Sequence, residues 1–185
     1  MKKALLVLLL TLTMLFTFGC GGDDQKDGTA TDVNGANQVI IAIEPDYVTM
    51  DPGYCYEMYA PMIVNAAYDT LFRFTKEDEP PVPHLVDTYE VSPDNLVYTF
   101  ELKPDIKFAS GNPLTAADVK FSFDRMKYLQ SNASSLATGI KSVEAKDDTT
   151  VIVTLSQPDS AFLAKTTYCS FGVLDSKVVG ENGGI

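Results

Sequence analysis

The sequence predicts a mixed α/β fold for residues 38–185, because strand-like and helix-like hydrophobic patterns alternate along the chain. Apolar or aromatic side chains recur at every second position from Leu96 to Leu102, a spacing typical of a half-buried strand. Between Ala116 and Met126 they recur at helical spacing instead. Further strand-like runs follow, so strands and helices are expected to share one core.

Composition restricts the class of protein to which the chain can belong. It has 185 residues, of which 45% are hydrophobic, so it can bury a core and is not a disordered chain. A formal net charge of −11 argues against a nucleic-acid-binding protein, which needs a basic surface to meet phosphate. We therefore expect an acidic globular domain with no nucleic-acid partner.

Few residues could carry catalysis or bind a metal. Three cysteines cannot supply the four thiolates of a tetrahedral zinc site, and His84 is the single histidine, for which a surface or packing role is expected. No Gly-x-Ser-x-Gly nucleophile motif occurs in the sequence. Asp51, Asp69 and Asp118 fall on separate predicted elements, where capping and turn roles explain them. The sequence thus predicts a protein that is not an enzyme and has no metal or cofactor.

The first twenty residues predict an export signal that ends at a cysteine. A basic start is followed by the uncharged apolar run Ala4–Phe18, the layout of a signal peptide. The stretch Thr17–Cys20 resembles a bacterial lipobox, which implies that residues 1–19 are removed and that Cys20 becomes the lipidated first residue. An ordinary secretory signal cleaved nearby and an uncleaved N-terminal anchor are the alternatives.

Residues 20–37 are expected to form a lipidated cysteine and a flexible tether. Glycine, aspartate and small polar residues dominate this segment, and Val33 is its one sizeable apolar side chain. Such a composition cannot bury enough surface to fold. The predicted location is therefore the extracytoplasmic face of a membrane in the cell envelope, with the lipid holding the domain there.

The folded part begins with an apolar, β-branched run, Gln38–Ile43, which indicates a buried strand. Asp51-Pro52 breaks the extended pattern, and Pro61 stands at a favoured first position of a helix. Residues 80–83 are rich in proline and are expected to form an extended turn.

A hairpin is predicted over residues 88–102, with its turn at Ser92–Asn95. Tyr98 and Phe100 fall on one face of its second strand and are expected to be buried. The sequence then predicts a helix from Thr115, the N-cap with Asp118 three residues on, to about residue 129. The expected partners of the buried strand face are the helix residues Val119, Phe123 and Met126.

The C-terminal part shows a second hairpin and weaker signals around it. Residues 131–135 form a polar break, and the hairpin pairs 140–145 with 150–155. A short helix is expected to start at 158–160, and an apolar run follows at 171–174. The end of the chain, from Glu181, is expected to be a loop.

Four segments resemble motifs of family 5 of the bacterial extracellular solute-binding proteins, the oligopeptide-, dipeptide- and nickel-binding lipoproteins of ABC importers. Residues 65–71, N-A-A-Y-D-T-L, are similar to N-x-x-Y-D-x-L, and residues 91–102 to V-S-x-D-G-L-x-Y-T-F-x-L. Residues 106–123 resemble V-K-F-H-D-G-x-P-L-T-A-x-D-V-x-F-S-F, and 142–158 resemble S-V-E-A-x-D-D-x-T-V-x-x-x-L-x-x-P. The resemblance covers residues 39 to about 180. Asn95 replaces a turn glycine, which its tolerance of left-handed backbone allows, and Ala109-Ser110 replaces a polar pair.

The resemblance implies a type II periplasmic-binding-protein fold, of which this chain would be an N-terminal fragment. It assigns Ile40 to the first strand of the main lobe and residues 65–175 to an inserted subdomain, with the second lobe absent. The implied function is a substrate-binding lipoprotein that serves an ABC permease and ATPase, most often in peptide uptake. The alternatives are a structural or signalling lipoprotein with the same fold, or a relative that imports nickel or another small solute. Such a fragment is expected to bind no solute tightly by itself.

Candidate ligand contacts lie in the segment Tyr54–Tyr59, which follows Asp51-Pro52. In the family, the segment after this Asp-Pro lines the cleft, which implies solute contact by Tyr56, Glu57 or Met58. Tyrosine offers an apolar face with one polar group, and methionine adapts its shape, so both suit varied ligands. The alternative is that these residues pack in the core at the start of the next helix.

Two cysteines remain once Cys20 is assigned to lipid. Cys55 and Cys169 lie 114 residues apart, and an exported protein meets conditions in which a disulfide persists. Closing such a loop would stabilise the fold by roughly 4–5 kcal/mol in the chain-entropy model. The alternative is a pair of buried free thiols.

Overall fold

The computed structural model describes residues 49–184 of the chain. The predicted signal peptide, Cys20, the tether and the strand at 38–43 lie outside the described residues. Within 49–184, no helix is long and apolar enough to cross a membrane.

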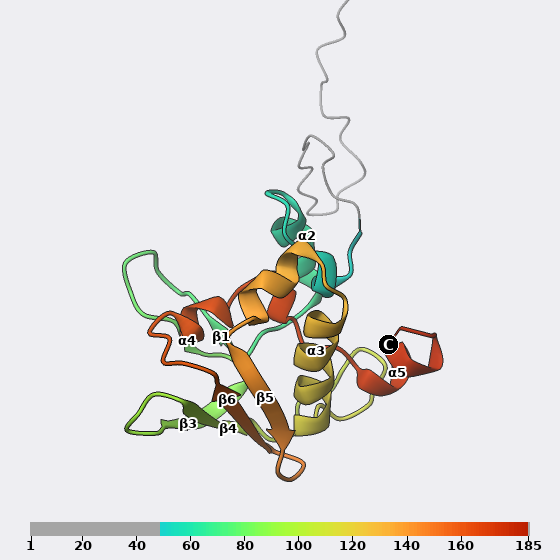
Figure 1. Ribbon diagram of the computed structural model, residues 1–185. Coiled ribbons are helices and arrows are strands. Elements are labelled where there is room, and N and C mark those ends of the chain that lie inside the picture. The colour runs from blue at the N-terminus through green and yellow to red at the C-terminus, as the bar shows by residue number, and fades with distance from the viewer. Residues whose placement is uncertain (1–48, 185) are drawn as a thin grey trace, which may run out of the picture. The chain divides into compact units, whose positions relative to one another are not determined.

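One antiparallel sheet of four strands organises this part of the chain (Figure 1). Its order is β3-β4-β6-β5, which brings the two predicted hairpins side by side through their second strands. The bounds of the strands are β3 Val86–Val91, β4 Val97–Leu102, β5 Ile140–Ala145 and β6 Thr150–Leu155. Both hairpins are confirmed, and Asn95 adopts the expected left-handed backbone with a φ of 56°.

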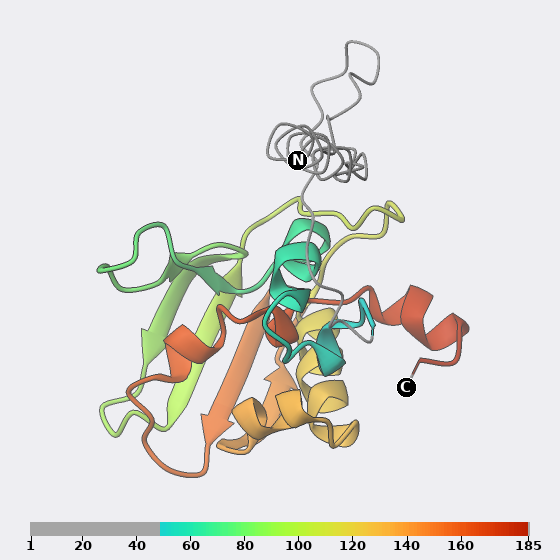
Figure 2. The same cartoon turned by 90° about the horizontal axis from the view of Figure 1, so that it is seen from above.

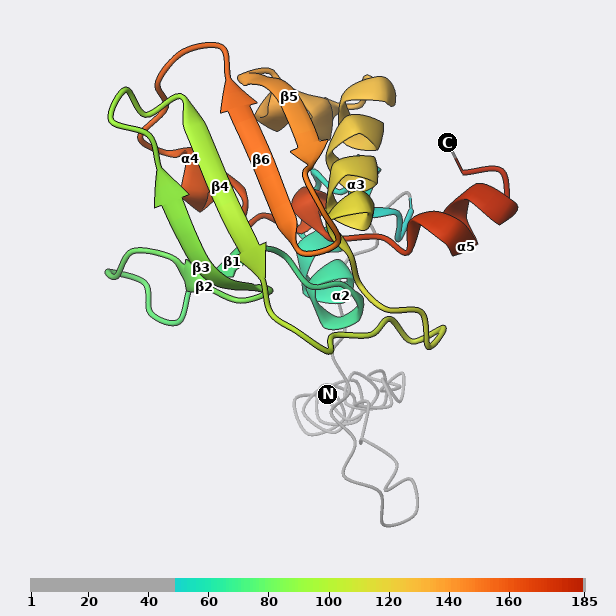
Figure 3. The same cartoon turned by 90° about the horizontal axis from the view of Figure 1, so that it is seen from below.

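The sheet buries one face, as its period-two pattern predicts. On β4, Tyr98, Phe100 and Leu102 are buried, while the residues between them are partly exposed. On β6, Val151, Val153 and Leu155 are buried in the same way. Figure 3 views the sheet from the face that carries no helix, with α4 (Phe162–Lys165) behind it.

Helix α3, Ala116–Tyr128, covers the β5 and β6 side of the buried face. It begins with the predicted capping box, in which the Asp118 carboxylate accepts from the Thr115 N–H at 2.8 Å. The predicted face of Val119, Phe123 and Met126 is fully buried in the main core.

The partners of β4 differ from the prediction, although its burial is confirmed. The Phe100 ring lies 5.6 Å from Phe72 and 6.2 Å from Tyr98, and Tyr98 lies 4.7 Å from Phe162. The half of the sheet formed by β3 and β4 is thus covered by the short strand β1 and by α4, while α3 lies over the other half. Periodicity identifies the buried face of a strand but not the element that covers it.

Short elements make up the rest of the described chain, and Figure 2 shows the helices on one side of the sheet. They are η1 Pro52–Tyr54, α2 Ala60–Ala67, β1 Phe72–Arg73, β2 Val82–Pro83, η2 Asn132–Ala137, η3 Cys169–Phe171 and α5 Ser176–Glu181. Two of them correct the sequence prediction. The polar break is the 3-10 helix η2, and α5 forms just before the expected terminal loop, where Asp175 caps it by accepting from the Val178 N–H at 3.1 Å.

Candidate functional site

The candidate ligand contacts lie in the segment Asp51–Tyr59, which contains η1 and leads into α2. Its centre, Cys55, is fully buried, whereas Tyr54, Tyr56 and Met58 are 43%, 48% and 78% exposed. Cys55 is thus buried between two exposed tyrosines, and Pro52 and Gly53 at the beginning of the segment are buried as well.

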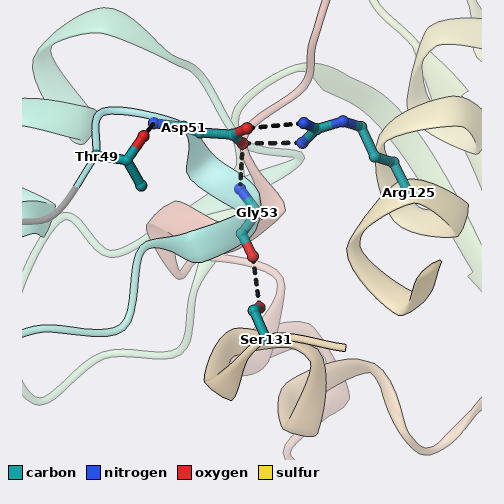
Figure 4. Close-up of polar contacts among 5 residues, drawn as sticks. All are labelled: Thr49, Asp51, Gly53, Arg125 and Ser131. Carbon is teal, nitrogen blue, oxygen red and sulfur yellow. Dashed lines mark hydrogen bonds and ion pairs between the residues drawn. The ribbon is translucent and has the colours of Figure 1, made fainter. Parts of the chain in front are cut away.

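Asp51 holds the beginning of the segment in two ways (Figure 4). Its Oδ1 accepts from the Gly53 N–H at 2.9 Å, so it caps η1 as the sequence predicts. Both carboxylate oxygens also accept from the Arg125 guanidinium, at 2.8 and 2.7 Å. The Arg125 side chain is 9% exposed, and the hydrogen bonds to Asp51 raise its pKa above the ordinary value. A buried arginine that keeps its charge needs such a partner.

Gly53 lets the segment approach the end of α3 closely. A Cβ at this position would overlap Leu129 Cδ1 and would lie 3.0 Å from Arg125 Nη1. The Gly53 carbonyl oxygen accepts from Ser131 Oγ at 2.6 Å (Figure 4). Only glycine fits here without displacing a neighbour.

Cys55 holds the other end of the anchored stretch. The structure joins it to Cys169 in a disulfide, with the two Cα atoms 6.3 Å apart. Its carbonyl oxygen accepts from Ser170 Oγ at 2.6 Å. Cys55, Cys169, Ala60 and Val64 form a small apolar cluster of their own, beside the main core.

Tyr56, Glu57 and Met58 are all accessible in the described part of the chain, so the alternative that they pack in its core does not describe their position. The Tyr56 N–H donates to Glu57 Oε2 at 3.2 Å. Burial raises the pKa of the nearby Tyr168, and the negative charges of Glu57 and of ionised Tyr56 add to the effect.

Two hollows lie near these residues, one lined in part by Glu57 and the other by Tyr168. One, of about 320 Å³, is lined by Thr49, Tyr54, Glu57, Gln130, Ser131 and Asn132. The other, of about 450 Å³, reaches Tyr168 from the side of α2 and includes Asn65, Arg73 and His84. Tyrosine, amide and carboxylate groups in a hollow can hold a small polar solute by hydrogen bonds and apolar contact.

His84 and Asp118, which the sequence also singles out, make polar contacts in the structure. His84 Nε2 lies 2.8 Å from Asp69 Oδ1, and Asp118 belongs to the cap of α3. Among residues 49–184, no group of three or more His, Cys, Asp or Glu side chains could hold a metal ion. Sequence reasoning missed Arg125, because its partner Asp51 is 74 positions away and no local pattern links them.

The chain is similar to several known proteins. Residues 80–183 match the model of the family described as bacterial extracellular solute-binding proteins, family 5 middle. The glutathione-binding protein GsiB of Pectobacterium atrosepticum is 34% identical over 136 residues, which cover 72% of this chain and 26% of that protein.

Solved structures of solute-binding proteins also superpose on this chain. The substrate-binding domain of an oligopeptide ABC transporter from Bacillus anthracis superposes with a TM-score of 0.68 at 28% identity, over 72% of this chain and 29% of that one. NikZ from Campylobacter jejuni, in complex with Ni(L-His), superposes with a TM-score of 0.66 at 31% identity, over 75% and 27%. These neighbours have the type II periplasmic-binding-protein fold, which confirms the predicted fold class. The chain spans about a quarter of the length of the relatives it matches.

Proposed function

Because the chain belongs to family 5 of the bacterial extracellular solute-binding proteins, we propose that it forms part of a receptor that delivers a solute to an ABC importer. The observation that carries this proposal is the family match over residues 80–183, a range that includes all four strands of the β3-β4-β6-β5 sheet. The partners in this proposal are a permease and an ATPase, and the chain acts by binding rather than by catalysis.

Tyr56, Glu57 and Met58 supply one wall of the solute site in this proposal. Tyr56 and Met58 are exposed and Glu57 is partly exposed, so all three can meet a ligand, while the bonds of Asp51 and Cys55 fix the backbone beside them. A solute that contacts this wall and another part of the receptor at the same time binds more tightly when the two parts are close together. It therefore shifts the receptor toward that closed arrangement.

Peptides are the proposed solute class. GsiB is named for glutathione, itself a peptide, and the Bacillus anthracis protein for oligopeptides. The complex of NikZ with Ni(L-His) supports a second candidate, an amino-acid chelate of nickel. Both classes carry amine and carboxylate groups that the tyrosine, amide and carboxylate side chains around the segment can meet.

The test is calorimetry on the product of the full open reading frame that contains this sequence. The probes are glutathione, a mixed library of dipeptides and oligopeptides, and Ni(L-His). The proposal predicts binding of a peptide probe at about micromolar affinity or tighter, which corresponds to roughly 8 kcal/mol. Binding of Ni(L-His) alone would favour the second candidate, and no binding of any probe would contradict the proposed function.

Residues 21–185 tested alone are expected to bind these probes weakly. The region of similarity covers 26% of the matched GsiB, so contacts to the solute are shared with parts that this chain does not match. Micromolar binding by residues 21–185 alone would show that the site is complete within them.

A further inference from the structure

The segment Asp51–Tyr59 has little regular structure to hold it in place. Its only helical turn is the three-residue η1, and regular structure resumes at Ala60. Its local backbone bonds run from the Tyr54 N–H to the Asp51 carbonyl and from the Cys55 N–H to the Pro52 carbonyl. The position of the exposed side chains therefore depends on contacts with distant elements.

Those contacts come from two places and stop before the exposed run. Arg125 and Ser131, at the end of α3 and the beginning of η2, hold Asp51 and Gly53. Cys169 and Ser170, in η3, hold Cys55. Tyr56 follows directly in the chain, so a displacement of Asp51–Cys55 moves Tyr56 as well.

We propose that Arg125 is a positioning residue, which sets where Tyr56, Glu57 and Met58 stand by holding Asp51 against the end of α3. The Cys55–Cys169 bridge is the second fixed point of the same stretch. The consequence for solute binding rests on the proposed function, whereas the consequence for the order of the segment does not.

The chemistry of the pair explains why arginine is needed. A guanidinium presents two parallel N–H donors in a planar fork, which fixes the orientation of a carboxylate as well as its distance. A lysine ammonium at this position offers a single point of contact instead. Arg125 Nε is buried without a partner among the described residues, so Asp51 supplies the main compensation for the buried charge.

A purely structural role in α3 is distinguishable from positioning. The helix is held by its capping box at Thr115 and by Val119, Phe123 and Met126 in the main core. Loss of the pair should therefore loosen the segment while the sheet and the core face of α3 remain ordered.

The chain contains no tryptophan, so Tyr56→Trp introduces a single indole fluorophore in the segment. In this background we compare Arg125→Lys and Asp51→Asn with Lys120→Gln, a control that breaks the exposed ion pair with Asp124 on the same helix. Asp51→Asn keeps a side-chain oxygen for the cap of η1. The measurements are acrylamide quenching of the introduced indole, hydrogen exchange of peptides over 51–59 and over the strands, and the urea midpoint.

Both pair variants are expected to raise exchange over 51–59 by about tenfold or more, as loss of charge-assisted hydrogen bonds implies, and to increase quenching of the indole. Exchange in the strands and all readings of Lys120→Gln are expected to stay unchanged. A segment as protected in Arg125→Lys as in the control would overturn the proposal, as would a lower urea midpoint with an unchanged segment.

Solute affinity separates this proposal from the proposed function. If the receptor carrying Arg125→Lys binds a peptide probe at least about tenfold more weakly while its urea midpoint is retained, the positioning role extends to binding. If the unsubstituted receptor binds no probe, the proposed function fails, and the exchange of 51–59 still decides the role of Arg125. If affinity and exchange are both unchanged by the substitution, the positioning role is wrong.

Discussion

Phe100 shows at the scale of a residue what periodicity can predict. Its position two residues from Tyr98 and from Leu102 predicts burial, and it is fully buried. Its nearest aromatic rings belong to Phe72 and Tyr98, and the first of these lies on a two-residue strand that no pattern in the sequence indicates. A buried face follows from local spacing, but the identity of its cover depends on the tertiary fold.

Phe100→Ala is expected to lower the free energy of unfolding by about 3–5 kcal/mol, because it removes a fully buried ring and leaves a cavity. Thr99→Ala is the matched control, since Thr99 is on the partly exposed face of the same strand. Urea unfolding followed by circular dichroism measures both. Equal losses for the two variants would mean that the register of β4 is wrong.

Some helices and strands can be predicted from residues that are close in the sequence, and others cannot. Both hairpins and α3 could be predicted, because alternation, turn residues and a capping box all lie within a few positions of each other. Helix α5 was missed because part of its support is distant. The Asp118 Oδ1 atom accepts from the Ser176 N–H and Oγ at 3.0 and 2.6 Å, and Ser110 Oγ donates to Asp175 at 2.5 Å.

The turn of the second hairpin predicts a pH dependence. Hydrogen bonds from the Thr150 hydroxyl and from the Thr149 and Thr150 N–H groups lower the pKa of Asp147 to about 2. Since this folded-state pKa is below the ordinary value of 3.8, the contribution to stability is present above about pH 4 and is lost as the pH falls from about 4 to 2.

Asp147→Asn is therefore expected to flatten the fall in stability over that acid range, measured as urea midpoints from about pH 5 to about pH 2. Asp148→Asn removes the same charge at the next position and serves as the control. Identical acid profiles of Asp147→Asn and the unsubstituted protein would contradict the role given to the turn.

The disulfide links elements at opposite ends of the described chain, so its removal tests how they are held. The Cys55→Ala/Cys169→Ala variant is expected to lose roughly 4–5 kcal/mol of stability in the chain-entropy model. In the unsubstituted protein, a maleimide should label Cys55 and Cys169 only after reduction in denaturant. Labelling of both in denaturant without reductant would show that they are free thiols.

At the scale of the whole molecule, the sequence predicts an anchor at residues outside the described part. An acidic chain with a net charge of −11 has no electrostatic attraction for anionic lipid, so we propose that the lipid on Cys20 holds it at the membrane. Cys20→Ala is expected to move the protein from the membrane fraction to the soluble fraction. Mass spectrometry should find diacylglyceryl-Cys20 as the first residue, and a different, unlipidated N-terminus would contradict the anchor.

The candidate solute contacts could be chosen from the sequence only through the family resemblance, since tyrosine and methionine near a helix equally suit a core. The structure adds that Cys55 is buried, together with Pro52 and Gly53, whereas Tyr56 and Met58 are exposed. It also adds the support from Arg125, which no local spacing could indicate. Long-range contacts therefore account for most of what was not predicted at this site.

The most direct test is the affinity of the receptor for a peptide probe after substitution in the segment, measured by calorimetry. Tyr56→Ala and Met58→Ala are each expected to weaken binding by about tenfold, because each removes a contact in the wall of the site. Tyr128→Ala is the control, because Tyr128 is also exposed but lies on α3, outside the segment. It should change the affinity less than about twofold. Unchanged affinity in both Tyr56→Ala and Met58→Ala would contradict the claim that this segment meets the solute.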